Sequence, residues 1–234
     1  MVPDEMDRPA LTRIVDELCQ VEYLDTLMIS LNRASVDDYQ RTCDFFARYP
    51  GRKVVLWSES PPIQEFLEQM TQVGLAVGEP GKGRACWLAL GHLLAEERVE
   101  YVAFQDADVV TYKREMLARL VLPTLDPTVD FDFVKGYYAR VSDRLHGRLT
   151  RLMLAPLLTA FTRLIGADPY IRYLSSFRYA LSGEFAVKCD LAQRMRLAAD
   201  WGLEIVTLFE ALRHRNANRI CQVADRSYSV WRIW

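Results

Sequence analysis

The sequence lacks any cysteine pattern that would indicate a disulfide framework or a structural zinc site. It has five cysteines in 234 residues, an odd number, and none of them form a C-x-x-C pair. Disulfide-stapled domains and zinc ribbons need even numbers or short spacings, so neither class is expected here. Scattered cysteines instead predict a protein of a reducing compartment, the cytoplasm.

Long apolar segments are also lacking. Acidic residues at Asp4 and Asp7 interrupt the start of the chain, so no signal peptide is expected there. The longest apolar stretch, 152–167, contains Pro156 and Arg163 and is too short to span a bilayer. No association with a membrane is therefore predicted.

A strong overall charge of either sign is missing, because 29 basic and 31 acidic residues leave a net charge of -2. Nucleic acid is therefore not expected as a partner. The segment 135–178 is an exception, since eight basic and two acidic residues give it a net charge of +6. For any single arginine a solvated helix face is the better explanation, but the local excess favours an anionic ligand nearby.

Hydrophobic periodicity predicts an α/β chain. Short apolar strands are expected at 26–31, 53–57, 99–104, 131–138 and 219–223. The spacing of apolar residues predicts helices at 11–21, 37–48, 63–73, 87–94, 147–164 and 201–213. Alternation of this kind in the first half predicts a mostly parallel sheet flanked by helices within a single domain.

Two carboxylates, Asp106 and Asp108, directly follow the expected strand at 99–104. Ligands of parallel α/β sheets bind beyond the carboxyl ends of the strands, and two carboxylates suit a hard divalent cation. An acidic turn capping the next helix explains the same residues equally well. The D-x-D pattern alone leaves both interpretations open.

A glycine-rich turn at 78–83 contains Gly81 and Lys82 and precedes an expected helix. Glycines allow the backbone to approach a phosphate, and the helix N-terminus favours an anion. Lys82 could reach such a phosphate. The spacing matches neither a P-loop nor a dinucleotide fingerprint, so an ordinary turn is slightly favoured when the segment stands alone.

Two further groups of polar residues lie in the second half of the chain. Gly147, Arg148 and Thr150 begin an expected helix inside the basic segment, where Arg148 offers a planar fork to a carboxylate or phosphate. A solvated helix start explains them as well. Glu184 and Glu204 each lie close to a glycine, where a carboxylate could accept hydrogen bonds from sugar hydroxyls or cap a helix.

Taken in order, six motifs are more specific than any one of them. They read PGKGRACWLAL, FQDADVVTY, FVKGYYARV, GRLTRLMLAPLL, LSGEFA and DWGLEI. This ordered set resembles the glucosyl-3-phosphoglycerate synthase family, from about position 8 to position 228. Members of that family are retaining glycosyltransferases with the GT-A fold, related to mannosylglycerate-type synthases.

The resemblance implies roles for the matching residues. Gly81, Lys82, Asp106, Ser182 and Gly183 would bind the nucleotide-sugar, with Asp106 nearer the ribose. Asp108 would be the principal metal ligand, together with Asp106. Gly147, Arg148 and Thr150 would hold the acceptor, and Glu184 and Glu204 would line the donor sugar as candidate catalytic residues.

The resemblance also implies the reaction. A hexose, usually glucose, would pass from UDP-glucose or a GDP-linked sugar to 3-phosphoglycerate or glycerate with retention, using Mg or Mn. Residues 1–130 would bind the nucleotide-sugar and metal, and residues 131–234 the acceptor. Relatives in this family suggest a homodimer.

Two departures from the family pattern keep an alternative open. The family's apolar first strand has only three residues, beginning with Met1, as its counterpart. The segment 229–234 stands where the family has a metal-binding histidine, so the third metal ligand has no counterpart. The alternative is a catalytically impaired, nucleotide-sugar-binding paralogue or a truncated form. A nucleotidyltransferase, which would share the aspartate pair, gains no support because its signature after the first strand is missing.

Overall fold

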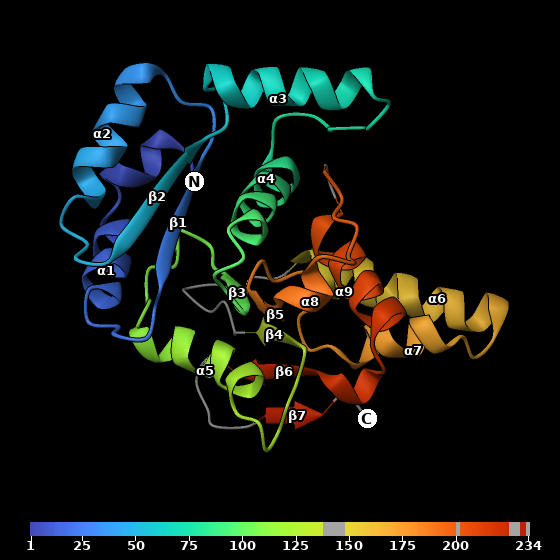
Figure 1. Ribbon diagram of the computed structural model, residues 1–234. Coiled ribbons are helices and arrows are strands. Elements are labelled where there is room, and N and C mark those ends of the chain that lie inside the picture. Colours follow the sequence, from blue (N-terminus) through green and yellow to red (C-terminus); the bar gives the residue numbers. More distant parts are fainter. Residues whose placement is uncertain (138–147, 200–201, 225–229, 233–234) are drawn as a thin grey trace. The chain divides into compact units, whose positions relative to one another are not determined.

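The computed structural model describes residues 1–137, 148–199, 202–224 and 230–232 (Figure 1). The chain forms two compact units, and each is described by itself. The first unit comprises Met1–Val99, Asp106–Met116 and Leu197–Leu203. The second comprises Glu100–Gln105, Leu117–Arg196 and Glu204–Trp234. Both units therefore combine segments that are distant in the sequence.

The first unit is built on a parallel pair of strands, β1 (Thr26–Leu31) and β2 (Arg52–Trp57). The helices of this unit are η1 (Pro3–Asp7), α1 (Pro9–Leu18), α2 (Val36–Phe46), α3 (Pro61–Gln72) and α4 (Lys82–Ala95). Local chemistry sets their starts: Pro9 occupies the first turn of α1, and Ser35 caps α2. The Ser35 hydroxyl accepts the Asp38 N–H at 3.2 Å, while Asp38 accepts the Ser35 N–H at 2.9 Å.

Apolar faces of these elements form the core of the first unit. One cluster joins Met6, Leu11 and Val15 to Ile29 of β1 and Phe46 of α2. A second cluster packs α3 and α4 against the strands through Leu56, Leu67, Leu88 and Ala89. The helical spacing of the buried residues of α1 is what places them on one face.

The second unit contains a sheet with the strand order β3-β5-β4-β6-β7. Its strands are β3 (Tyr101–Phe104), β4 (Phe133–Tyr137), β5 (Phe185–Lys188), β6 (Ile220–Ala224) and β7 (Val230–Arg232). Pairing is parallel between β4 and β6. It is antiparallel for β3 with β5, β4 with β5, and β6 with β7. The short β5 thus separates β3 from β4.

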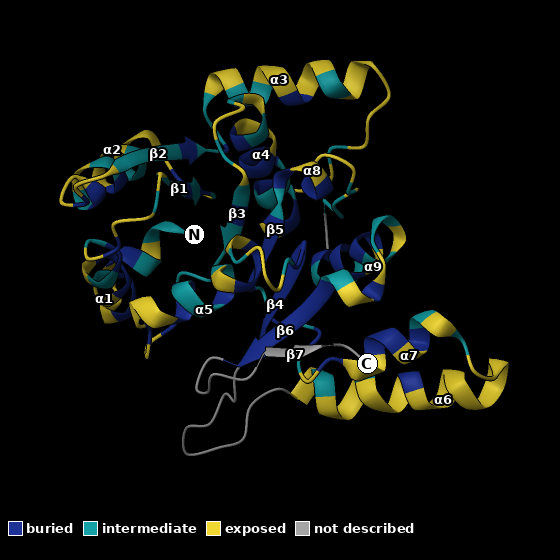
Figure 2. Ribbon diagram, turned by 60° about the horizontal axis from the view of Figure 1, so that its bottom comes forward, coloured by how far each residue is buried: buried dark blue, intermediate teal, exposed yellow. Residues whose placement is uncertain are grey.

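Stacked aromatic rings join the strands of this sheet. Phe185 of β5 lies 4.5 Å from Phe104 of β3 and 5.5 Å from Phe133 of β4, measured between ring centroids. The helices that lie wholly or mostly in this unit are α5 (Arg114–Leu125), η2 (Thr150–Leu154), α6 (Ala155–Ile165), α7 (Pro169–Ser176), α8 (Cys189–Ala192), α9 (Leu203–His214) and η3 (Ala217–Arg219). Figure 2 shows β4 and β6 deeply buried, whereas most of α6 is exposed.

The prediction of an α/β chain is confirmed by these elements. The expected strand at 26–31 matches β1 residue for residue, and the strand expected at 99–104 is shorter. The starts of the helices expected at 147–164 and 201–213 lie outside the described residues. The division at residue 130 stays a prediction. None of the described helices is long and apolar enough to cross a membrane.

Candidate functional site

Asp106 and Asp108 lie in the loop that follows β3 and belong to the first unit. Asp106 is half-buried, and its Oδ1 accepts a hydrogen bond from Lys82 Nζ at 2.8 Å. Asp108 is exposed and has no hydrogen bond or ion pair with any described residue. One carboxylate is therefore positioned by a cation, while the other is available to a ligand.

This pair of carboxylates fits a divalent cation of the Mg²⁺ type. Such ions take oxygen ligands, and protein sites often supply one or two carboxylates while substrate phosphates and water complete the shell. No group of three or more His, Cys, Asp or Glu side chains able to hold a metal occurs among the described residues. Oxygens of a phosphorylated substrate and of water would add to these two carboxylates around a cation.

The glycine-rich turn places Lys82 at the start of α4. Gly81 is the N-cap residue of this helix. Because glycine has no side chain, no N-cap side chain accepts a hydrogen bond from the first N–H groups. Gly78 adopts a positive φ of 67°, and a Cβ there would lie 2.5 Å from the Cβ of Ala199. Only glycine fits this approach. Lys82 and an uncapped helix N-terminus together favour an anion at this position.

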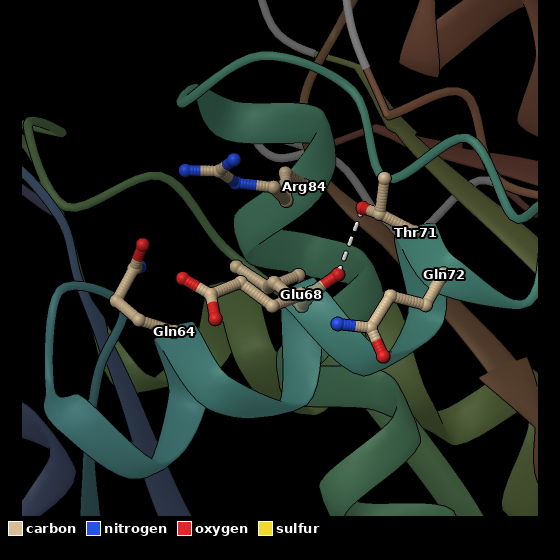
Figure 3. A pocket seen from close by; sticks show the side chains of 6 residues that line it. Gln64, Glu68, Thr71, Gln72 and Arg84 are labelled. Carbon is tan, nitrogen blue, oxygen red and sulfur yellow. Dashed lines mark hydrogen bonds between the residues drawn. The ribbon is translucent and has the colours of Figure 1, made fainter.

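A shallow hollow lies between α3 and α4 in the same unit, and one of the residues that line it, Arg84, follows closely after Lys82 in the sequence (Figure 3). Its volume is about 360 Å³, and it is lined by Gln64, Leu67, Glu68, Thr71, Gln72 and Arg84. None of the residues predicted for the site lines it. Arg84 donates to the carbonyl oxygen of Gly78 at 3.2 Å, which ties α4 to the glycine-rich turn.

Ser182, Gly183 and Glu184 form the turn that leads into β5 in the second unit. Ser182 and Glu184 are buried, with 2% and 4% of their surface exposed. The Ser182 hydroxyl donates to the carbonyl oxygen of Gly136, and the Gly136 N–H donates to the Glu184 carbonyl oxygen at 2.9 Å. The turn is thus tied to the carboxyl end of β4, where the sequence predicted part of a sugar site.

Lys135 of β4 is a buried residue beside this turn that the sequence did not single out. It is 1% exposed, and its Nζ donates to the Ser182 carbonyl oxygen at 2.6 Å. The available signal was a lysine within the apolar strand motif FVKGY, which lies both in the basic segment and in one of the six family motifs.

Glu204 is the second residue of α9, and its half-buried carboxylate lies in the first turn of that helix. Gly202, just before it, has a φ of 122°, which favours glycine. The helix N-terminus stabilises a carboxylate at this position. Capping of the helix and contact with a ligand hydroxyl are both compatible with this place.

Arg148 and Thr150 lie at the start of the helical segment that contains η2, whereas Gly147 lies outside the described residues. Arg148 is exposed and available to an anion. The Thr150 hydroxyl is buried and has no hydrogen-bond partner among the described residues. Buried hydroxyls are normally paired, so this one is a candidate for contact with a ligand. The segment η2 is a π-helical turn, a type of turn that is frequent at functional sites.

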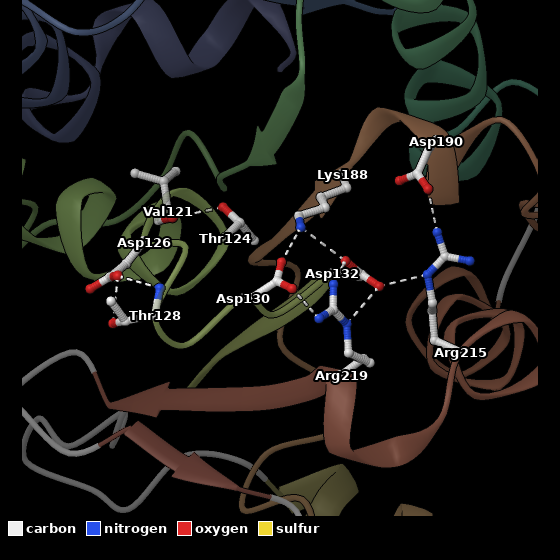
Figure 4. Close-up of polar contacts among 10 residues, drawn as sticks. All are labelled: Val121, Thr124, Asp126, Thr128, Asp130, Asp132, Lys188, Asp190, Arg215 and Arg219. Carbon is white, nitrogen blue, oxygen red and sulfur yellow. Dashed lines mark hydrogen bonds and ion pairs between the residues drawn. The ribbon is translucent and has the colours of Figure 1, made fainter.

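A separate charge cluster stands at the amino end of β4, away from Gly136 (Figure 4). Asp132 is 4% exposed and binds Lys188 at 3.1 Å, Arg215 at 2.6 Å and Arg219 at 2.7 Å. Asp130 joins Lys188 and Arg219, and Asp190 joins Arg215. Three cations face three carboxylates, so the cluster is neutral and serves stability.

Proteins of known identity resemble the chain along most of its length. No protein-family profile matches it. A glucosyl-3-phosphoglycerate synthase of Persephonella marina is 40% identical over 219 residues, which is 94% of this chain and 54% of the relative. One from Methanococcoides burtonii is 35% identical, with the same two coverages. The chain thus spans about half the length of the curated relatives it matches.

Solved structures of a glucosyl-3-phosphoglycerate synthase also resemble the chain. The glucosyl-3-phosphoglycerate synthase of Mycobacterium tuberculosis in complex with Mn²⁺, UDP and glucosyl-3-phosphoglycerate has a TM-score of 0.66 and 25% identity, covering 94% of this chain and 66% of that one. The same enzyme with Mn²⁺, UDP-glucose and glycerol 3-phosphate has a TM-score of 0.65 and 26% identity, with the same coverages. The chain therefore has the GT-A glycosyltransferase fold, and over 94% of its length it is a homologue of the glucosyl-3-phosphoglycerate synthases.

Proposed function

We propose that the chain transfers glucose from UDP-glucose to 3-phosphoglycerate with retention, in a reaction that depends on Mn²⁺ or Mg²⁺. The observation that carries the proposal is the set of Lys82, Asp106 and Asp108 beside an uncapped helix N-terminus. Its chemistry suits a metal-bound diphosphate, and relatives with this fold bind Mn²⁺ with UDP or UDP-glucose.

The first group of residues would hold the donor. Asp108 and Asp106 would hold the cation, and Lys82 would balance the diphosphate charge while it keeps Asp106 in place. A divalent cation supplies Lewis-acid stabilisation of the negative charge that develops on the leaving diphosphate. Ser182, Gly183, Glu184 and Glu204 would recognise the sugar, because the carboxylates of the buried Glu184 and the half-buried Glu204 are strong acceptors for hydroxyl groups.

The second group would hold the acceptor. Arg148 can pair with the phosphate or carboxylate of 3-phosphoglycerate, and the buried Thr150 hydroxyl can donate to the same anion. The acceptor hydroxyl oxygen bonds to the anomeric carbon while the bond from that carbon to the diphosphate oxygen breaks. The hydroxyl proton passes to the departing diphosphate on the same face, which gives retention.

The proposal also divides the chain by main role, with the sugar contacts at 182–184 and 204 lying in its second part. Residues 1–130 would bind the nucleotide-sugar and metal, and residues 131–234 would bind the acceptor. The five scattered cysteines are consistent with a cytoplasmic enzyme, since a reducing compartment keeps them as thiols.

The experiment that tests the proposal is a matrix of donors and acceptors. UDP-glucose and GDP-glucose would be combined with 3-phosphoglycerate and glycerate, each with Mn²⁺ and with EDTA. Glucosyl-3-phosphoglycerate formed only from UDP-glucose in Mn²⁺ supports the proposal. Metal-dependent UDP binding without turnover would instead establish the nucleotide-sugar-binding paralogue.

Arg148→Ala is expected to raise the KM for 3-phosphoglycerate roughly 10- to 150-fold, the loss expected for a charge-assisted contact. The KM for UDP-glucose should stay unchanged, because the donor contacts lie on other residues. Steady-state kinetics with each substrate varied in turn measures both values. Arg163→Ala removes an exposed arginine of α6 in the same basic segment and serves as the control. A parallel loss of donor affinity in Arg148→Ala would place this arginine in the nucleotide site.

We further propose that the chain forms a homodimer through the exposed face of η2 and α6. Leu152 is 72% and Leu164 is 78% exposed, and both belong to a set of large exposed apolar side chains: Leu149, Leu152, Met153, Leu157, Phe161, Leu164 and Ile165. A contiguous apolar face of this kind is rare on monomers and typical of protein–protein contacts.

Leu157→Glu is therefore expected to shift the protein toward the monomer, because it places a charge in the apolar contact. Sedimentation velocity at several protein concentrations measures the shift. Val36→Glu, on the exposed start of α2, is the matched control and should leave the distribution unchanged. A wild-type protein that sediments as a monomer at all concentrations would refute the dimer.

A further inference from the structure

Lys135 is a buried lysine inside an apolar strand. It is 1% exposed and lies between Val134 and Gly136 in β4, which packs on both sides within the second unit. Burying an ammonium group costs free energy unless strong hydrogen bonds replace its water shell. An aliphatic residue would pack at this position without that cost. The presence of the charge therefore calls for a reason other than packing.

The ammonium group is directed at the turn before β5. Its Nζ donates to the carbonyl oxygen of Ser182 at 2.6 Å, outside the ladder of strand hydrogen bonds. The neighbouring Gly136 accepts a bond from the Ser182 hydroxyl and donates its N–H to the Glu184 carbonyl oxygen at 2.9 Å. Two adjacent residues of β4 thus hold the turn at Ser182 and at Glu184.

Gly136 also lies against the side chain of Glu184. A Cβ at position 136 would lie 3.1 Å from the Glu184 Cβ and 3.3 Å from its Oε2, so the carboxylate lies against the backbone of Gly136. Glu184 is 4% exposed. The backbone of β4 therefore constrains the position of this buried carboxylate.

We propose that Lys135 is a positioning residue for sugar recognition: its ammonium group fixes the turn 182–184 so that Glu184 receives the hydroxyl groups of the transferred sugar. This inference rests on the proposed function. Lys135 itself touches neither substrate. A misplacement of the carboxylate by a fraction of an ångström would weaken sugar contacts but leave the contacts of the nucleotide intact.

The decisive variant is Lys135→Met, which keeps the length and apolar stem of the side chain and removes its charge. The variant keeps the apolar packing and loses one buried hydrogen bond, a cost that a domain of ordinary stability can bear. We expect kcat/KM for UDP-glucose to fall roughly 10- to 100-fold, the range for a misplaced binding group. The inhibition constant of UDP, which lacks the sugar, should remain unchanged in Mn²⁺.

A matched control is Lys53→Met in β2 of the first unit. Lys53 is also a strand lysine whose ammonium group donates to a backbone carbonyl oxygen, that of Tyr49 at 3.0 Å. This variant should change neither kinetic constant. If Lys135→Met does not fold, Gly136→Ala tests the same idea, because the added methyl group would push the Glu184 side chain away and give the same split.

A double-mutant cycle separates positioning from general stability. If Lys135 acts through Glu184, Lys135→Met added to Glu184→Gln should cause little further loss in kcat/KM. Full additivity, unchanged kcat/KM in Lys135→Met, or an equal loss of UDP affinity would each overturn the role of Lys135. A wild-type protein that binds neither UDP nor UDP-glucose in Mn²⁺ would overturn the proposed function as well.

Discussion

Asp108→Ala is expected to abolish metal-dependent UDP binding and to lower kcat/KM by roughly 10³-fold or more, since several kcal/mol of Lewis-acid stabilisation are lost. The physical reason is that Asp108 is exposed and has no partner among the described residues, whereas Asp106 is already engaged by Lys82. Asp108 is thus the carboxylate most available to the cation. Isothermal titration of UDP in Mn²⁺ and in EDTA measures the effect.

The lack of partners also makes this variant easy to interpret. Because the described residues leave Asp108 without a hydrogen bond or ion pair, Asp108→Ala should melt at the wild-type temperature. Asp37→Ala, which removes an exposed aspartate from the first turn of α2, is the control for the loss of one negative charge. UDP binding that keeps its full dependence on Mn²⁺ in Asp108→Ala would refute the assignment of the metal site.

The sequence predicts the first unit well because its signals are local. The strand β1 is a short apolar run between Asp25 and Asn32, and α1 and α2 carry their start signals in Pro9 and Ser35. Such features are decided by neighbouring residues in the chain. The resemblance placed Lys82 and Asp106 in one nucleotide-sugar site, but it did not predict the hydrogen bond between them.

The second unit was harder to predict because its sheet depends on distant pairing. β5 contains only four residues, too few for a clear hydrophobic period, yet it lies between β3 and β4 and pairs with both. This pairing is what brings Ser182 and Glu184 against Lys135 and Gly136. The contact of Lys135 with this turn therefore could not be predicted from the sequence, because it depends on the register of β4 and β5.

Neutralising Asp132 is expected to have the largest effect on stability. This buried carboxylate is surrounded by Lys188, Arg215 and Arg219, so Asp132→Ala leaves three cations without their shared partner. Loss of one member of a buried ion pair costs about 3–5 kcal/mol, and this change should lower the free energy of unfolding by that amount. Chemical denaturation monitored by circular dichroism measures it. Asp190→Ala removes an exposed carboxylate that binds the same Arg215, and it should cost much less.

The same cluster predicts how stability depends on pH. Burial alone would raise the pKa of Asp132, but hydrogen bonds from Arg219, Lys188 and Arg215 outweigh burial and hold that pKa below its usual range. Hydrogen bonds from Arg219 and Lys188 likewise lower the pKa of Asp130. A carboxylate with a lowered pKa stabilises the folded state above its unfolded pKa of about 4, and this stabilisation is lost as pH falls through the folded pKa. Wild-type stability should therefore decrease below about pH 4, and less steeply in Asp132→Asn, which has one such carboxylate fewer. Equal slopes in the two proteins between pH 5 and the acid transition would show that folding does not lower the pKa of Asp132.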